Sequence, residues 1–164
     1  MSTPTTNIER APGADQIPEV DAWVGLLRAH AAVTRQFNRE LIASHGLTIN
    51  DFEVLMHLEH AEGGRLRRVD LAERVLLTAS GITRLLDGLE KSGFVCKAAC
   101  SADARVTYAE ITDPGRAILA SAEGSHLAAV RALFAERFSA EELESLSTLL
   151  HRLPLAPPSD ACPG

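Results

Sequence analysis

The strongest constraint on the fold of this chain is one stretch, Thr78–Val95, in which apolar residues recur at the spacing of a single helix face. That face is formed by Ile82, Leu85, Leu86 and Leu89. Threonine is a common N-cap and glycine often takes the left-handed position after a helix, so Thr78 and Gly93 predict the two ends. The stretch therefore predicts a helix of about a dozen residues with one buried face.

The opposite face of this predicted helix is small or hydrogen-bonding near its N-terminus, where it carries Ser80, Gly81, Thr83 and Arg84. A helix with such a face can enter the major groove of DNA. Just before it, Arg68–Val75 predicts a shorter helix whose inward residues are Val69, Leu71, Ala72 and Val75. Two helices joined by a short turn, here Leu76–Thr78, form a helix-turn-helix.

Two short runs rich in β-branched and aromatic residues, Phe94–Ala98 and Val106–Ile111, predict a pair of strands. The polar segment between them, Ala99–Arg105, predicts the loop of a hairpin. A hairpin directly after a DNA-reading helix is a wing, and its tip can place an arginine in the minor groove. The predicted fold class is mostly α with a small β-hairpin wing, a winged helix-turn-helix flanked by N- and C-terminal helices. The alternative is an ordinary α+β packing module that binds nothing.

Charge is unevenly distributed along the chain. The formal net charge is −6, yet residues 65–105 hold eight Lys and Arg against five Asp and Glu, a net charge of +3. The rest of the chain holds eight against seventeen, a net charge of −9. A basic segment can contact phosphate while an acidic remainder limits nonspecific association, so this distribution is compatible with DNA binding.

We expect residues 1–18 to be a disordered N-terminal arm, residues 19–153 to be a single domain, and residues 154–164 to be a flexible tail. No apolar run approaches the roughly 20 residues that span a bilayer, and the N-terminus lacks the apolar segment of a signal peptide. Three cysteines without regular spacing argue against a disulfide framework and favour a cytoplasmic protein.

Two helices are predicted before the helix-turn-helix. The first runs from Val20 to about His45 and ends at Gly46. The second begins at Thr48, which forms a capping box with Asp51. The predicted inward residues of the second helix are Phe52, Leu55, Met56 and Glu59.

Two more helices are predicted after the wing. Asp113 predicts the N-cap of a long helix with Pro114 at its first position, loosened around Gly124–Ser125 and reaching Phe138. Ser139 and Glu142 then predict a capping box for a last helix. The apolar residues of the last helix are Leu143, Leu146, Leu149, Leu150 and Leu153.

The order and spacing of these motifs resemble the MarR family of bacterial winged-helix transcriptional regulators, over roughly residues 20–153. The resemblance rests on Leu71-Ala72-Glu73, Ser80 with Thr83-Arg84, Leu89-Glu90-Lys91 with Gly93-Phe94-Val95, Asp103-Ala104-Arg105, and Ile111-Thr112 with Gly115-Arg116. It implies a DNA-binding part at about residues 48–112 and dimerisation helices at about 19–46 and 113–153. Interleaved helices of two subunits would form a homodimer on a palindromic operator, with half-sites about one turn, ~10 bp, apart.

Two positions depart from the pattern of the family. The first wing strand usually carries a basic pair, and Cys96-Lys97 leaves one charge there. Ala104 stands in the wing turn where a second arginine is common. Both departures predict weaker phosphate contact than is typical of the family. The predicted DNA-binding residues are Thr78, Ser80, Gly81, Thr83, Arg84, Lys91, Lys97, Asp103 and Arg105.

A candidate ligand pocket is suggested by Trp23, Asp70 and Arg116. An indole face, an arginine and a carboxylate could together bind a flat, anionic or amide-rich aromatic molecule. The set is similar to that of the urate-responsive subgroup of the MarR family, with Arg105 in place of a further arginine. The alternative is a core tryptophan, a capping aspartate and a solvated arginine.

Other constellations have simpler explanations. Glu53, His57 and His60 share one stripe of the second helix, where solvated charge is the usual reading and no metal is expected. Cys96 and Cys100 lie in or beside the wing, with Cys162 in the tail, and a thiol at the wing could sense oxidants, although small residues of low reactivity are the ordinary case. No catalytic motif, phosphate loop or cofactor motif is present, so an enzyme is not expected.

The sequence thus predicts a sequence-specific regulator that binds duplex DNA, a repressor whose DNA binding is relieved by a small aromatic or anionic ligand. One alternative is a winged-helix module that binds proteins instead of DNA. Another is a thiol-based redox-sensing regulator that uses Cys96 and Cys100.

Overall fold

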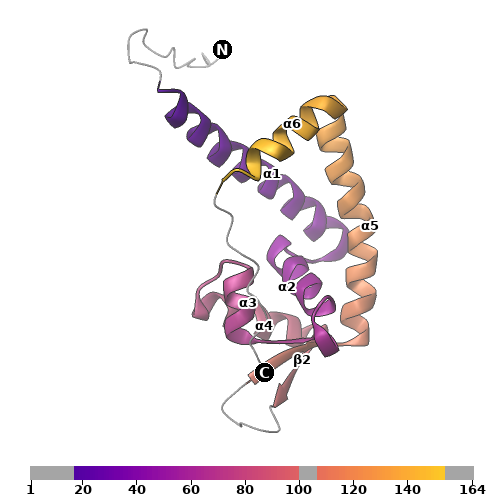
Figure 1. The fold of residues 1–164 in the computed structure, drawn as a ribbon. Coiled ribbons are helices and arrows are strands. Elements are labelled where there is room, and N and C mark those ends of the chain that lie inside the picture. The colour runs from indigo at the N-terminus through magenta and orange to yellow at the C-terminus, as the bar shows by residue number, and fades with distance from the viewer. Residues whose placement is uncertain (1–16, 100–106, 154–164) are drawn as a thin grey trace, which may run out of the picture. The chain divides into compact units, whose positions relative to one another are not determined.

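The structure is a computed structural model that describes residues 17–99 and 107–153 (Figure 1). Contacts divide the chain into two compact units, one ending at Arg35 and the other beginning at Gln36. The described residues form six α-helices, one short 3-10 helix and three strands. None of the helices in this part of the chain is long and apolar enough to cross a membrane.

Helix α1 spans Pro18–His45 and crosses the boundary between the two units. It ends before Gly46, whose φ of 68° is the left-handed conformation predicted there. In the second unit, Phe37 and Leu41 of this helix are buried. In the first unit, its large exposed apolar residues are Val20, Trp23, Leu26 and Leu27.

Helix α2 spans Ile49–Glu59 and belongs to the core of the second unit. The predicted capping box is present, because Thr48 Oγ1 accepts from the Asp51 N–H and the Asp51 carboxylate accepts from the Thr48 N–H. Its buried residues are Phe52, Val54, Leu55 and Leu58. The inward position predicted for Glu59 was wrong, and Val54 and Leu58 were missed. Because α2 contacts α3, α4, α5 and the sheet, it is buried on several sides rather than along one stripe.

The predicted helix-turn-helix consists of α3, Arg68–Arg74, and α4, Ala79–Lys91. Of the four residues predicted to form the buried face of α4, Ile82, Leu86 and Leu89 are buried, and Leu85 is partly buried against the core. Thr78 is the N-cap, and Gly93 beyond the last turn has a φ of 76°. In α3, however, Val69 is 62% exposed, which contradicts its predicted inward position. Leu71 is the buried residue of this short helix, and a residue two positions earlier points to the opposite side.

The sheet has three antiparallel strands in the order β1-β3-β2: β1, Arg65–Arg67; β2, Val95–Ala99; and β3, Thr107–Ile111. Strands β2 and β3 form the predicted wing hairpin, with Val95 opposite Ile111. Strand β1 was not predicted, because its sequence has two arginines around one leucine. It exists through its pairing with β3, and the 3-10 helix at Glu62–Gly64 leads into it from α2.

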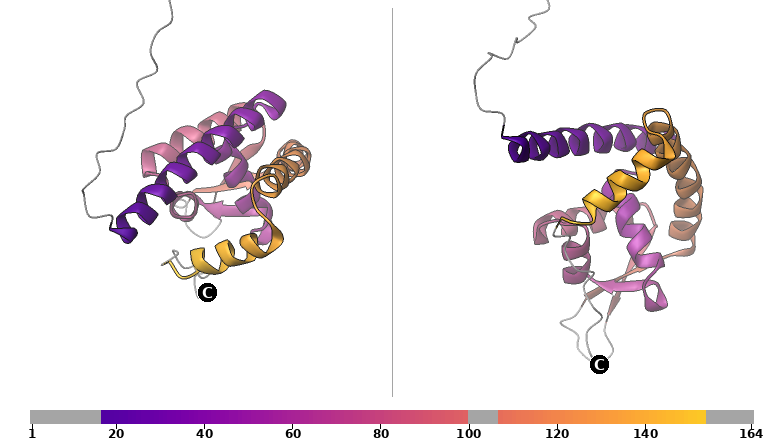
Figure 2. Two further views of the ribbon diagram at one scale, coloured as in Figure 1. Left: turned by 90° about the horizontal axis from the view of Figure 1, so that it is seen from above. Right: turned by 45° about the horizontal axis from the view of Figure 1, so that its top comes forward.

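Helix α5 spans Asp113–Ala135 and packs on α2 (Figure 2). Its N-cap is Thr112 and not Asp113, and Pro114 lies at the second helical position. The Thr112 hydroxyl donates to the Gly93 carbonyl and accepts from the Gly115 N–H, so it caps the helix and joins it to the end of α4. The helix continues through residues 124 and 125, where loosening was predicted, and it ends before Phe138.

Helix α6 spans Ala140–Leu150. Ser139 and Glu142 form the predicted capping box at its start. None of its residues is buried. Leu149 and Leu150 at its end are exposed, and so is Leu153 beyond it. The apolar face of α6 therefore remains accessible in a single chain.

Candidate nucleic-acid interface

The outward face of α4 begins with a set of small polar residues around its N-cap. Thr78 Oγ1 accepts from the Gly81 N–H at 3.1 Å and lies 3.2 Å from Ser80 Oγ. A Cβ at Gly81 would lie 3.2 Å from Thr78 Oγ1, so a larger residue would crowd the cap. The first turn thus exposes the hydroxyl-bearing residues Thr78 and Ser80.

Two basic residues of α4, Arg84 and Lys91, are exposed. They are seven residues apart, which is close to two helical turns, so both extend from the same face. Within the described residues, neither forms an ion pair with a carboxylate. Both charges are therefore available for an external anion such as a DNA phosphate.

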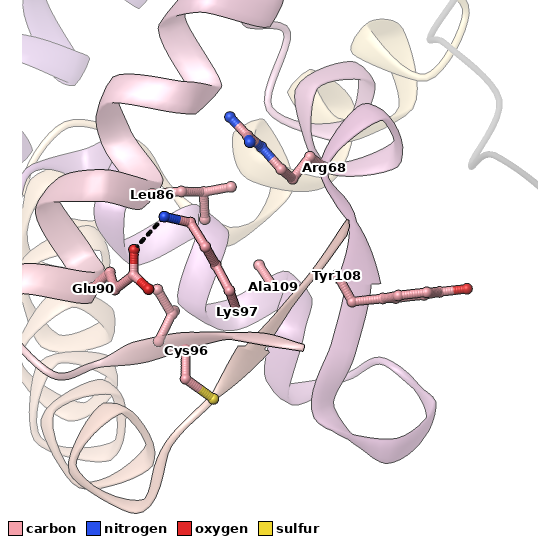
Figure 3. A pocket seen from close by; sticks show the side chains of 8 residues that line it. Arg68, Leu86, Glu90, Cys96, Lys97, Tyr108 and Ala109 are labelled. Atoms are coloured by element: carbon pink, nitrogen blue, oxygen red, sulfur yellow. Dashed lines mark ion pairs between the residues drawn. The ribbon is translucent and has the colours of Figure 1, made fainter. Parts of the chain in front are cut away.

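The third basic residue predicted in this region, Lys97 of β2, is engaged by α4. Its Nζ lies 2.7 Å from Glu90 Oε2 and 3.7 Å from Asp87 Oδ1 (Figure 3). Hydrogen bonding to Glu90, and attraction to both carboxylates, raises the pKa of Lys97. The first strand of the wing is thereby connected to the helix.

Thr83 is also engaged within the protein. Its hydroxyl donates to the Ala79 carbonyl at 2.7 Å and accepts from Nη2 of Arg68, the first residue of α3. Sequence reasoning did not select Arg68, although residues 65–68 contain three arginines and signalled a local positive charge. Next to this contact is a groove of about 590 Å³ between α3 and α4, lined in part by Arg68, Glu73 and Thr83.

Each residue of the predicted ligand pocket is described within its own unit, and Asp70 and Arg116 have different partners. Asp70 accepts two hydrogen bonds from the Arg67 guanidinium, each 2.8 Å long. Arg116 forms an ion pair with Glu59 at the end of α2. Trp23 belongs to the first unit, where its side chain is 59% exposed. Asp70 and Arg116 thus pair with different residues of the second unit, whereas Trp23 belongs to the first unit.

The histidine, glutamate and cysteine groups singled out in the sequence lie partly within the described residues. In the described ranges, no group of three or more His, Cys, Asp or Glu side chains could hold a metal ion. His60 Nδ1 lies 2.8 Å from a backbone carbonyl of its own helix, and burial lowers the pKa of His57. Cys96 is an exposed free thiol. The predictions for Cys100, Asp103, Arg105 and Cys162 lie outside the described residues.

Comparison with known protein sequences identifies similar regulators. Residues 45–106 match the MarR family. The HTH-type transcriptional regulator MhqR of Bacillus subtilis is 30% identical over 133 residues, which cover 81% of this chain and 89% of MhqR. The HTH-type transcriptional repressor YetL of the same organism is 35% identical over 108 residues, which cover 66% of this chain and 64% of YetL.

A solved structure confirms the fold class. Sco3205, a MarR family transcriptional regulator from Streptomyces coelicolor that was crystallised with DNA, matches with a TM-score of 0.76 and 26% identity. The match covers 88% of this chain and 90% of that one. The predicted mostly helical winged fold with a small antiparallel sheet is therefore correct.

Proposed function

Because the chain belongs to the MarR family of transcriptional regulators, we propose that it recognises a specific duplex DNA sequence through helix α4. The observation that carries this proposal is the outward face of α4, on which Ser80, Arg84 and Lys91 are all exposed. Arginine can donate two hydrogen bonds to guanine in the major groove, and lysine can contact phosphate. Membership of this family also means that the chain regulates transcription and is not an enzyme.

The active form that we propose is a homodimer on a palindromic operator. Two copies of α4 would then occupy half-sites about one helical turn, roughly 10 bp, apart. Exposed apolar residues near both ends of the described chain, including Trp23, Leu149 and Leu153, support association because such surface is normally covered. Since the similar protein YetL is named a repressor, repression is the regulatory outcome that we propose.

The test of DNA recognition is the affinity for the region upstream of the protein's own gene, measured over a range of salt concentrations. Arg84→Ala should weaken binding by about 1–3 kcal/mol and relax the preference at one base position, if Arg84 reads a base edge. Lys91→Ala is the matched comparison, because loss of a phosphate contact should weaken binding to all sequences and reduce the salt slope by about 1.

The outcomes separate the candidate functions. A folded Arg84→Ala variant with wild-type affinity and sequence preference would contradict the role of Arg84. If the wild-type protein binds neither the upstream region nor an unrelated duplex at low salt, the alternative of a winged-helix module that binds proteins becomes the better description.

The regulatory ligand that we propose is a small aromatic anion, with Trp23, Asp70 and Arg116 as candidate contacts. Arg116 supports this proposal, because its side chain is 39% exposed and is paired with the similarly exposed Glu59. A carboxylate or an enolate on a ligand could replace Glu59 as the partner of the guanidinium. The urate-responsive character suggested by the sequence is one form of this proposal.

The ligand proposal is tested by titrating urate and simple phenolic acids against the protein–DNA complex. Release of DNA should accompany quenching of Trp23 fluorescence, and Asp70→Asn and Arg116→Ala should each weaken both responses at least tenfold if each residue contributes a charged hydrogen bond. If both variants release DNA and quench Trp23 fluorescence as the wild-type protein does, Asp70 and Arg116 have structural roles only. The groove between α3 and α4 would then be the better candidate for the ligand site.

A further inference from the structure

Lys97 is held closely against α4. Figure 3 shows its side chain extending from β2 toward Glu90, while Cys96, the preceding residue, points away from them. The cavity between β2 and α4 at this place measures only about 10 Å³, room for no more than a single water molecule. The ammonium group of Lys97 thus ends beside Glu90, with Asp87 one turn earlier on the same helix.

The two carboxylates of this cluster lie beside the face proposed to meet DNA. Asp87 follows Arg84 by three residues and precedes Lys91 by four, so it neighbours both on the helix surface. The side chain of Asp87 is 47% exposed and that of Glu90 is 37% exposed. A carboxylate near a DNA phosphate is repelled, and the repulsion acts over about 10 Å at moderate salt. The second half of α4 therefore carries negative charge where DNA is expected to approach.

We propose that Lys97 is the counter-charge of Asp87 and Glu90 and not a ligand of DNA phosphate. It neutralises part of the negative charge on α4 and fastens strand β2 to the helix, so that the reading face and the wing approach DNA together. Lys97 is in this sense a positioning residue, and the proposal rests on the proposed DNA binding by α4. It replaces the phosphate contact that the sequence predicts for Lys97.

The alternative is that Lys97 leaves the carboxylates and contacts phosphate in the complex. That movement would separate an ammonium from a carboxylate oxygen at 2.7 Å and would leave two unneutralised carboxylates near the DNA. Both effects oppose binding. Arg84 and Lys91, which have no carboxylate partner among the described residues, can contact phosphate without such a loss.

The pairing is tested first in the free protein. Carbon-13 NMR of labelled lysine follows the titration of Lys97, with Lys97→Gln used to assign its resonance. The pKa of Lys97 is raised when the pair is formed, so Glu90→Gln should lower it toward the ordinary lysine value. An unchanged titration in Glu90→Gln would overturn the proposal, whatever the protein does with DNA.

The role of Lys97 in the complex is tested with Lys97→Gln and the double variant Glu90→Gln/Lys97→Gln on the upstream DNA. The single variant should bind about fivefold more weakly at low salt, because both carboxylates then face the DNA unneutralised. The double variant restores the net charge of the cluster, so most of the lost affinity should return with the wild-type salt slope. If Lys97 contacts phosphate, the double variant stays weak and its slope falls by about 1.

Lys91 provides the matched control, because it lies on α4 and carries the same charge. Lys91→Gln should weaken binding and reduce the salt slope, and Glu90→Gln should not restore that slope. If Glu90→Gln restores the affinity and the salt slope equally in Lys91→Gln and in Lys97→Gln, only the net charge matters. That result would overturn the proposed pairing. If the wild-type protein binds no duplex, the proposed function fails, while the NMR result still decides whether Lys97 and Glu90 are paired.

Discussion

Gly115, in the first turn of α5, occupies a place where no side chain can fit. A Cβ there would lie 2.1 Å from the Phe94 carbonyl oxygen and 2.9 Å from Ile111 Cγ1. The same carbonyl accepts a hydrogen bond from the Thr112 N–H at 3.1 Å, so the backbone cannot move away without losing that bond. Glycine is required here by the close approach of the wing and α5, and not by an unusual backbone angle.

Gly115→Ala should therefore destabilise the protein by about 2–3 kcal/mol, as expected for overpacking against a backbone atom. Gly124→Ala is the matched control in the same helix, since nothing lies within 4 Å of its added Cβ. That control should stabilise the protein by about 0.5–1 kcal/mol through helix propensity. Urea unfolding of the two variants measures both effects. Equal stability of the two variants would contradict the close approach.

Side-chain contacts within one turn of the chain were predictable from the sequence, and side-chain contacts between elements were not. The partners in the capping boxes at Thr48 and Ser139 are three residues away, so their spacing identified them. Arg68 and Thr83 are 15 residues apart, and Lys97 meets its carboxylates only because the hairpin folds beside α4. The spacing of apolar residues predicts which of them share a helix face, but it does not predict which strand packs against that helix.

Strands and helices also acquire character from their neighbours. Strand β1 is recognisable only through its pairing with β3, and α2 is buried on several sides because five other elements contact it. His126 of α5 is a further case of this kind. Its ring lies 5.0 Å from the rings of both Phe37 of α1 and Phe52 of α2, so three helices meet at one titratable side chain.

This junction predicts a pH dependence of stability. Burial lowers the pKa of His126, and Glu40 only partly opposes that shift. His126 therefore binds a proton more tightly in the unfolded chain, where its pKa is about 6.5, than in the folded protein. Stability present above about pH 6.5 should be lost as the pH falls through the lower folded-state value.

His126→Gln should reduce the pH dependence of the unfolding free energy measured between about pH 5 and pH 8. Some dependence should remain, because burial also lowers the pKa of His57. An identical pH dependence in the variant and the wild-type protein would exclude His126 as a source.

At the scale of the whole molecule, the described part of the chain leaves apolar side chains exposed on its last helix, α6. The core gathers around α2, whereas α6 has capping residues at its start and no buried side chain. A helix of 11 residues has little stability of its own in water. Its apolar face is therefore expected to be covered in the functional protein, and a second copy of the chain is the partner that we propose.

Leu150→Glu tests that assembly, because Leu150 is 38% exposed at the end of α6. Burying a carboxylate in an apolar interface should weaken the dimer by about 2 kcal/mol or more. Thr148→Glu is the matched control, with the same added charge at an exposed polar position of the same helix. Sedimentation velocity over a concentration range should show dissociation of the first variant only. Persistence of the dimer in Leu150→Glu would place the interface elsewhere.

Because α5 is a long and uninterrupted helix, a small rotation of it would produce a large displacement at one end. Twenty-three uninterrupted residues make a rod of about 35 Å, so a tilt of about 5° about its C-terminal end displaces its wing end by about 3 Å. That displacement is close to the spacing of successive base pairs, about 3.4 Å. A rotation of this size in one subunit of the proposed dimer would therefore displace its reading helix by about one base-pair step. An effector that turns α5 by a few degrees could thus put the second reading helix out of phase with its half-site.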